Sequence, residues 1–356
     1  MGKLTALAGA LLTPHGADRY LELLNPMLVR HEVRGVVTRV RRQTSDTVTI
    51  ELRPSAAWRG FTAGQHVRLS VDIDGVRRTR CYSPCTSQHR EGTFELTVKA
   101  HSDGLVSGHL FRTAKPGVVV GLSPAEGDFT LPRPRPEKLL LISGGSGITP
   151  VLSMLRTLAD EAHHGEVAFV HYANGPADIP GLAELSALAR RCGARFLRGH
   201  PRATGGDLRG HCTREHLALA APWYREAAVY VCGPPPLMTA VGEIYAADGA
   251  SEQVHTEQFT ATAPALPAEG TTVDGRVRFA RTGTETGNSG LPLLDQAEAA
   301  GLSLDHGCRM GICYSCTQRK TRGTVRNVKT GSTCSETDQD IQLCVSVPLG
   351  DVEIDC

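Results

Sequence analysis

The first third of the chain alternates apolar and polar positions in short runs. Runs of this kind cover residues 48–52, 67–73 and 94–98, and Asp-Gly and Glu-Gly pairs lie between them. A period of two, combined with β-branched residues and turn-forming pairs, predicts strands that each bury one face. The pattern therefore predicts an antiparallel β-barrel or sandwich over residues 31–133.

A second pattern begins after the proline-rich segment 131–137. Continuous apolar runs, typical of strands buried on both faces, alternate here with runs of helical period. Strands are predicted at 138–143, 166–173, 194–199 and 227–233, and helices at 149–162 and 181–192. Strands that alternate with helices imply a parallel sheet with right-handed crossovers. An α/β domain is therefore expected over residues 134–256.

The end of the chain forms a third predicted domain, of the α+β class, over residues 276–356. A linker rich in Ala, Pro and Thr, with almost no charge, precedes it at 257–275. A strand is predicted at 276–283 and a helix at 291–302, and residues 341–355 alternate like a terminal strand pair.

Residues 1–30 form a predicted N-terminal leader. A secretion signal is disfavoured because no clear small-residue cleavage site follows the apolar run, and the run is too short to span a bilayer. We expect an amphipathic or packed helix at this position, and a cytoplasmic location for the protein.

Composition excludes some classes of partner. The 356 residues include 38 Lys plus Arg and 37 Asp plus Glu, so the formal net charge is +1. No broad basic field is available to bind nucleic acid. The odd total of 11 cysteines fits a fully paired disulfide framework poorly, and six of them lie after residue 307.

The cysteine-rich segment "CRMGICYSC" predicts an iron–sulfur site. Cys308, Cys313 and Cys316 have the spacing C-x4-C-x2-C, which plant-type 2Fe-2S domains complete with a distant fourth cysteine. Gly311 lets the loop wrap closely around a cluster. Cys344 is assigned as the fourth ligand because it begins an apolar run, with Cys334 as the alternative. A zinc site is disfavoured because only one C-x2-C pair is present.

Two segments in the barrel region carry groups suited to a flavin. The motif R-x-Y-S supplies a guanidinium for a phosphate, an aromatic ring for stacking and a hydroxyl near the reactive ring edge, from Arg80, Tyr82 and Ser83. Alone, this tetrapeptide fits an ordinary edge strand equally well. Downstream, Gly104 and Ser107 precede a short helix whose free N–H groups can bind a diphosphate.

Two strand ends in the α/β region predict a nicotinamide site. The segment "SGGSGITP" joins a buried strand to a helix, and a second strand ends in "CGPPP". The spacing is not G-x-G-x-x-G, but ligands bind at such strand ends in parallel sheets. The candidate residues are Gly144, Gly145, Gly147, Thr149, Cys232, Gly233 and Pro234. For Cys232 an inert buried thiol remains an alternative.

Together these motifs resemble the ferredoxin-NADP reductase family, followed by a plant-type ferredoxin domain of β-grasp fold. The resemblance implies FAD rather than FMN and a hydride path beside Cys232. It also implies that Glu257 and Phe259 cover one flavin face, so the candidate catalytic residues are Ser83, Cys232 and Glu257. Arg202 lies where NADPH-using relatives often carry an arginine, which favours NADPH over NADH; a solvated turn residue is the other interpretation.

The resemblance implies an NAD(P)H-dependent reductase. A nicotinamide delivers two electrons and a 2Fe-2S cluster accepts one, so a flavin is required between them. The segment 20–35 resembles the leader of reductases that serve acyl-CoA desaturases, which makes a fatty acyl-CoA desaturase the predicted acceptor. A membrane-bound partner would bring the leader near the bilayer. Ring-hydroxylating oxygenases of the Rieske type, steroid hydroxylases and cytochromes P450 are competing acceptors. A redox-sensing protein and a flavin reductase without a partner are the remaining alternatives.

Overall fold

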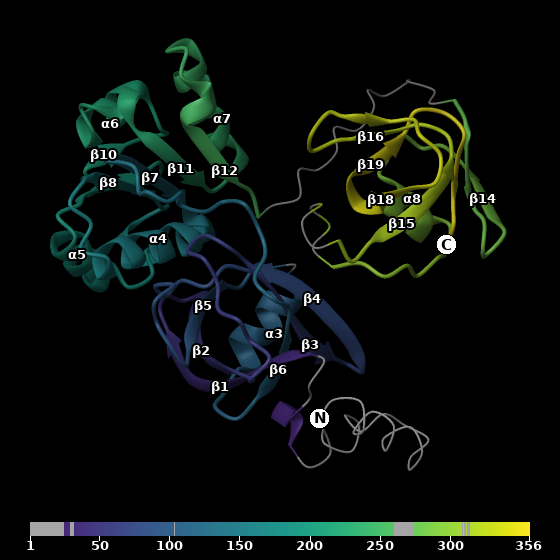
Figure 1. Ribbon diagram of the computed structural model, residues 1–356, viewed down its shortest axis with the longest axis horizontal. Coiled ribbons are helices and arrows are strands. Elements are labelled where there is room, and N and C mark those ends of the chain that lie inside the picture. Colours follow the sequence, from purple (N-terminus) through teal and green to yellow (C-terminus); the bar gives the residue numbers. More distant parts are fainter. Residues whose placement is uncertain are drawn as a thin grey trace. The chain divides into compact units, whose positions relative to one another are not determined.

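The computed structural model describes residues 25–28, 32–102, 104–259, 274–307, 309, 311 and 314–356. Most of the predicted leader and residues 260–273 of the predicted linker lie outside these ranges, apart from the short turn Pro26–Leu28. The chain divides into two compact units, Met1–Gln258 and Phe259–Cys356, which are described separately (Figure 1).

Six antiparallel strands form the first domain of unit one, in the order β4-β3-β6-β1-β2-β5. A bridge between Pro84 and Leu96 joins the two ends of this order, so the sheet curls into the predicted barrel. Helix α3 packs Val106 and Leu110 into the barrel core. The bounds are β1 Val33–Arg42, β2 Thr47–Pro54, β3 Val67–Ile73, β4 Val76–Tyr82, β5 Phe94–Lys99, α3 Leu105–Thr113 and β6 Val119–Leu122.

The second domain of unit one is a six-stranded parallel sheet, as the sequence predicts, in the order β10-β9-β8-β7-β11-β12. Its last strand, β12, reaches Glu257, one residue past the predicted end of the domain. The strands are β7 Lys138–Gly144, β8 Glu166–Tyr172, β9 Arg195–His200, β10 Leu208–Arg209, β11 Ala228–Cys232 and β12 Val254–Glu257. The helices are α4 Ile148–Asp160, α5 Leu182–Arg191, α6 Arg214–Ala220 and α7 Pro235–Ala247.

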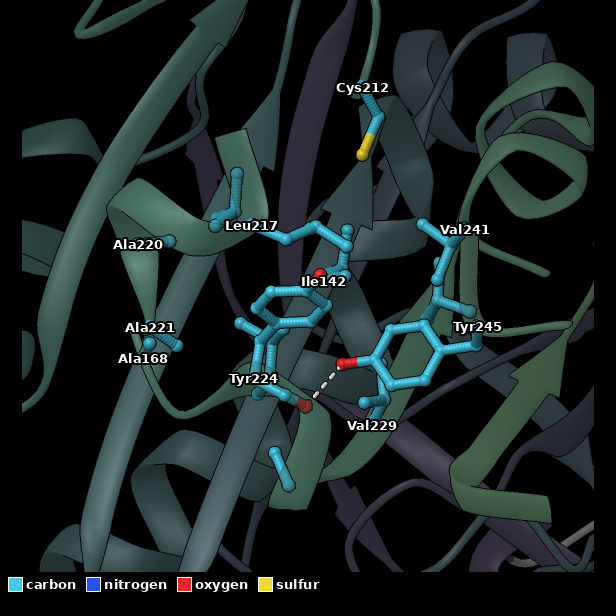
Figure 2. Packing of buried hydrophobic residues seen from close by; sticks show 14 of the residues in the cluster. Ile142, Ala168, Cys212, Leu217, Ala220, Ala221, Tyr224, Val229, Val241 and Tyr245 are labelled. Carbon is cyan, nitrogen blue, oxygen red and sulfur yellow. Dashed lines mark hydrogen bonds between the residues drawn. The ribbon is translucent and has the colours of Figure 1, made fainter. Parts of the chain in front are cut away.

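Helices α6 and α7 close one face of this sheet over an apolar core (Figure 2). Ile142, Ala168 and Val229 of the sheet belong to one buried cluster with side chains of both helices. The buried hydroxyl of Tyr245 donates to the carbonyl oxygen of Tyr224 at 2.7 Å, so its polar group is satisfied. This packing fixes β7 and β11, whose carboxyl ends carry the two nicotinamide motifs.

Helix α4 holds the barrel against the parallel sheet. Ser153 Oγ donates to the carbonyl oxygen of Thr86 at 2.7 Å, and Arg156 Nη1 donates to that of Cys85 at 2.7 Å. The same guanidinium lies 3.3 Å from the buried carboxylate of Glu95 in β5. The segment after the R-x-Y-S motif is therefore fastened to the helix that follows the glycine turn.

Glu161, just past α4, makes this joint sensitive to acid. Hydrogen bonds from Arg135 at 2.8 Å, and then from His89, lower the pKa of Glu161 to about 2. A depressed carboxyl pKa contributes stability above the unfolded value, and this contribution disappears as pH falls from about 4.5 to 2. We expect Glu161→Gln to lower the melting temperature at pH 7 and to lower it much less at pH 2.5, as measured by calorimetry. Glu91→Gln, at an exposed position, is the control that should show no such dependence.

Unit two contains a five-stranded sheet, β14-β13-β20-β15-β18, and a smaller sheet, β17-β16-β19, with one helix, α8, in its described part. The prediction of a terminal strand pair at 341–355 is wrong, because β19 pairs with β16 whereas β20 pairs with β13 and β15. The bounds are β13 Arg276–Phe279, β14 Thr284–Gly287, α8 Leu293–Ala299, β15 Thr317–Arg322, β16 Val325–Asn327, β17 Thr333–Cys334, β18 Gln339–Gln342, β19 Ser346–Pro348 and β20 Val352–Ile354.

Among the described residues, no helix combines the length and apolar character that crossing a bilayer requires.

Candidate functional site

The R-x-Y-S motif ends strand β4 and continues into a buried serine. Tyr82 packs against the barrel core, and burial raises the pKa of its phenol. Ser83 is 2% exposed, and its Oγ has no hydrogen-bond partner among the described residues. A buried hydroxyl without a partner is costly, and an acceptor at a flavin ring edge would satisfy it. Tyr82 and Ser83 therefore fit the predicted flavin.

The second flavin motif lies at the start of α3. Gly104 has an extended backbone and directly precedes the helix. A Cβ added at Gly104 would lie 3.1 Å from the Cβ of His101. Ser107 Oγ donates to the Gly104 carbonyl oxygen at 3.2 Å. Ser107 therefore stabilises the turn, and the free N–H groups of the first helical turn are the groups suited to a diphosphate.

The two nicotinamide motifs pack directly against each other. A Cβ at Gly147 would lie 2.7 Å from the backbone nitrogen of Gly233, and one at Gly144 would lie 2.8 Å from the ring of Pro234. Gly145 adopts the left-handed region with φ +53° and has open space in place of a side chain. The glycines thus permit both the contact between the loops and a ligand's close approach to the backbone. Thr149 is nearly buried beside this turn.

Cys232 lies on a row of buried polar residues across the sheet. Its direct neighbours in the register are Ser143 on β7 and Glu257 on β12. Burial, and then the charge of Glu257, raises the pKa of the Cys232 thiol well above its usual value, so the thiol stays protonated. Ser143 Oγ lies 2.8 Å from Nδ1 of His171, whose pKa burial lowers to about 3. The row is therefore polar but carries little charge apart from Glu257.

His66 is a site residue that the sequence analysis missed. It precedes β3, and its Nδ1 lies 3.3 Å from Glu257 Oε1, with both side chains at most 10% exposed. The contact joins the barrel to the last strand of the parallel sheet. Its Nε2 has no hydrogen-bond partner in the described part of unit one. No local pattern marks His66, because only the tertiary fold brings it to a glutamate 191 residues away in the chain.

Arg202 and Phe259 each follow a strand of the parallel sheet, β9 and β12 respectively. Arg202 is exposed in the turn after β9 and has no ion pair within the described ranges, whereas the neighbouring Arg198 is held by Asp207 at 2.9 Å. An unpaired guanidinium at the carboxyl end of a parallel strand is suited to a phosphate. Phe259 follows β12 and is half-buried.

Two of the four predicted cluster ligands are described, and they lie in adjoining segments. The Gly311 amide donates to Cys344 Sγ at 3.3 Å, and the Leu343 amide donates to the Cys316 carbonyl oxygen at 3.2 Å. Cys316 and Cys344 are at most 8% exposed. Cys308 and Cys313 lie outside the described residues, and no metal-binding group of three ligands is found among those that remain.

The alternative fourth ligand, Cys334, packs against the same apolar cluster as Cys316 and Cys344. It is half-buried in β17, where its backbone pairs with Val325. Amide hydrogen bonds to sulfur are typical of iron–sulfur sites, and Cys344 receives one from the cluster loop. The donor set therefore fits a 2Fe-2S cluster held with Cys344 better than one held with Cys334.

Fold and site together define a reductase that combines flavin, nicotinamide and iron–sulfur domains. Protein-family models match in the same order: an oxidoreductase FAD-binding domain over residues 34–131, an oxidoreductase NAD-binding domain over 141–243 and a 2Fe-2S iron–sulfur cluster binding domain over 278–349. The chain belongs to the family of ferredoxin reductase-type iron–sulfur flavoproteins. It is an NAD(P)H oxidoreductase whose cofactors are FAD and a 2Fe-2S cluster.

Relatives match over nearly the whole chain. An NADPH oxidoreductase of Mycobacterium tuberculosis is 36% identical over 99% of this chain and 92% of its own length. A glycine betaine monooxygenase reductase subunit of Pseudomonas aeruginosa is 32% identical over 83% of this chain and 87% of its own. The solved structure of a phthalate dioxygenase reductase shares the fold, with a TM-score of 0.62 and 24% identity over 92% of this chain and 98% of its own.

Proposed function

We propose that this protein transfers electrons from NADPH, through FAD and the 2Fe-2S cluster, to a fatty acyl-CoA desaturase. The observation that carries the relay is the contact of the glycine turn with the loop after Cys232, in the same compact unit as Ser83. This contact joins the two nicotinamide motifs, and the turn Gly145–Gly147 also contacts strand β5 of the barrel that carries the flavin motifs. When bound, FAD would supply the conversion between a two-electron hydride donor and the one-electron steps of a 2Fe-2S cluster.

The chain's own residues position and shield this transfer. The Ser83 hydroxyl donates to the flavin ring edge, and the protonated Cys232 thiol lines the nicotinamide side. Glu257, held by His66, closes the site from β12 and excludes water. In these roles Ser83, Cys232 and Glu257 are the proposed catalytic residues, and Phe259 covers the flavin.

The desaturase is proposed from the leader sequence at 20–35, most of which lies outside the described residues. In the desaturase, dioxygen would be reduced to two water molecules. Two of the electrons would come from NADPH and two from the acyl chain, which gains a double bond. A second candidate is an oxygenase, because relatives include reductase subunits named for glycine betaine and propane monooxygenases.

Reconstitution distinguishes the two acceptors. The purified full-length protein is mixed with NADPH and either an acyl-CoA desaturase, a Rieske-type oxygenase or a cytochrome P450, and product formed per NADPH consumed is measured. Tight coupling only with the desaturase is the expected result. Coupling only with an oxygenase would replace the desaturase by the second candidate. If NADPH bleached the flavin while the cluster remained EPR-silent, the relay itself would be refuted.

Arg202 gives a testable basis for the choice of NADPH. Support comes from its unpaired guanidinium and from the name of the M. tuberculosis relative. We expect Arg202→Ala to raise KM for NADPH about tenfold, the effect of losing one charge-assisted hydrogen bond, and to leave KM for NADH unchanged. Arg195→Ala, at the other end of β9, is the matched control. Equal losses with both nucleotides would show that Arg202 does not recognise the 2′-phosphate.

A further inference from the structure

Arg78, two residues before the R-x-Y-S arginine, is a half-buried cation that has no ion pair with any residue the structure describes. Its Nε is buried and has no hydrogen-bond partner among the described residues. Two arginines close to it in the barrel are paired: Arg68 lies 3.0 Å from Glu126, and Arg77 lies 3.8 Å from Asp72. A guanidinium withdrawn from water without an acceptor is destabilising. The described part of the barrel therefore places a cation at Arg78 and no anion beside it.

The strand register directs Arg78 to the flavin side of β4. Residues two apart on a strand share a face, so Arg78 lies on the same face as Arg80 and Tyr82. In the antiparallel register these three stand opposite core-facing residues of β3, namely Val71, Leu69 and Val67. Arg77 belongs to the opposite face and is more than half exposed. This face of β4 thus carries a row of three side chains, in which the aromatic ring of Tyr82 is followed by the guanidiniums of Arg80 and Arg78.

The spacing of this row follows the order of groups in a dinucleotide flavin. With a rise of about 3.4 Å per residue, Arg80 lies about 7 Å and Arg78 about 14 Å along the strand from Tyr82. In FAD the ring is followed by a ribityl chain, a first phosphate, a second phosphate and adenosine. Helix α3, whose N-terminus carries the second flavin motif, contacts both β3 and β4. Diphosphate groups between the row and this helix end would meet cations and amides on two sides.

We propose that Arg78 binds the phosphate on the adenosine side of FAD and so selects FAD over FMN. FMN ends at its first phosphate, so Arg80 reaches it and Arg78 does not. The anion that Arg78 lacks is then part of the cofactor. Arg78 thereby contributes to flavin affinity and to flavin choice, and it takes no part in the redox chemistry.

The test measures flavin affinity in the full-length protein after flavin removal, by quenching of flavin fluorescence on rebinding. For Arg78→Gln we expect the Kd for FAD to rise tenfold to a hundredfold, about the effect of one charge-assisted hydrogen bond, and the Kd for FMN to stay within twofold. Arg78→Lys should restore part of the FAD affinity. Arg77→Gln, on the opposite face, should change neither constant.

Two outcomes would overturn the proposal. An unchanged Kd for FAD in Arg78→Gln would mean that Arg78 does not contact the cofactor. An equal rise for FAD and FMN would place it at the first phosphate or in a purely structural role. The melting temperature of the flavin-free protein separates folding from binding: Arg78→Gln should be at least as stable as the wild type, because it removes an unpaired buried cation.

Discussion

Cys344→Ser is expected to abolish the reduced 2Fe-2S signal in EPR while leaving NADPH-dependent bleaching of the flavin intact. Cys344 is buried and accepts the Gly311 amide at 3.3 Å, which makes it the proposed fourth ligand. Three cysteines alone do not hold a plant-type cluster. Because cluster binding contributes to the free energy of folding, a domain that loses its cluster also loses stability. We therefore also expect a lower melting temperature for the iron–sulfur unit.

Cys334→Ser is the matched control for this experiment. Cys334 lies in the same unit and the same C-terminal region, but on strand β17. The Cys334→Ser variant should retain iron, sulfide and the EPR signal at wild-type levels. Loss of the cluster in Cys334→Ser, with retention in Cys344→Ser, would reverse the assignment. Ferricyanide reduction, which draws electrons from the flavin, reports on the integrity of the first unit in both variants.

Gly147→Ala should slow flavin reduction by NADPH at least a hundredfold. The added Cβ would lie 2.7 Å from the Gly233 nitrogen and nearer still to the Cys232 carbonyl oxygen, and both neighbours are backbone. The two loops must separate to admit it, and displacements of about 1 Å cost on the order of a hundredfold in rate where two reactants are aligned. Overpacking should also destabilise the unit by about 1 to 3 kcal/mol.

Gly242→Ala provides the opposite case in the same domain. This glycine lies inside α7, and a Cβ there would meet nothing within 4 Å. Alanine should stabilise the helix by about 0.5 to 1 kcal/mol without affecting the rate. Stopped-flow absorbance with NADPH, together with FAD content, tests both variants. A Gly147→Ala protein that binds FAD and is reduced within twofold of the wild-type rate would contradict the argument.

Local patterns predicted the strands and the order of the domains because burial has a direct signature in sequence. The alternating run at 67–73 coincides with β3, and the continuous apolar run at 138–143 falls within β7. The same signature does not identify strand partners, which is why the run at 341–355 was wrongly assigned to one strand pair. The alternation of apolar and polar residues indicates which side chains are buried, but it does not indicate which strand pairs with which.

A single sequence offers candidate site residues where the chemistry is local. The glycine turn, the R-x-Y-S motif and the cysteine spacing each combine ligand groups within a few residues. His66 was missed because its partner, Glu257, lies at the far end of the same unit. Arg78 was missed for another reason: the strand pattern marks its face, but only the structure shows that its buried Nε has no partner among the described residues. Contacts between distant segments and missing partners have no signal in a single sequence.

Strand β12 has a mechanical consequence. It is an edge strand, bonded only to β11, and the chain continues from it toward the iron–sulfur unit. Tension along the chain would therefore act on β12 from its carboxyl end and would peel it residue by residue. The first register pair to open under such a load is Cys232 with Glu257. The linker to the iron–sulfur unit thus begins directly after Glu257, a residue of the proposed site, so a force on the linker would act first on that residue.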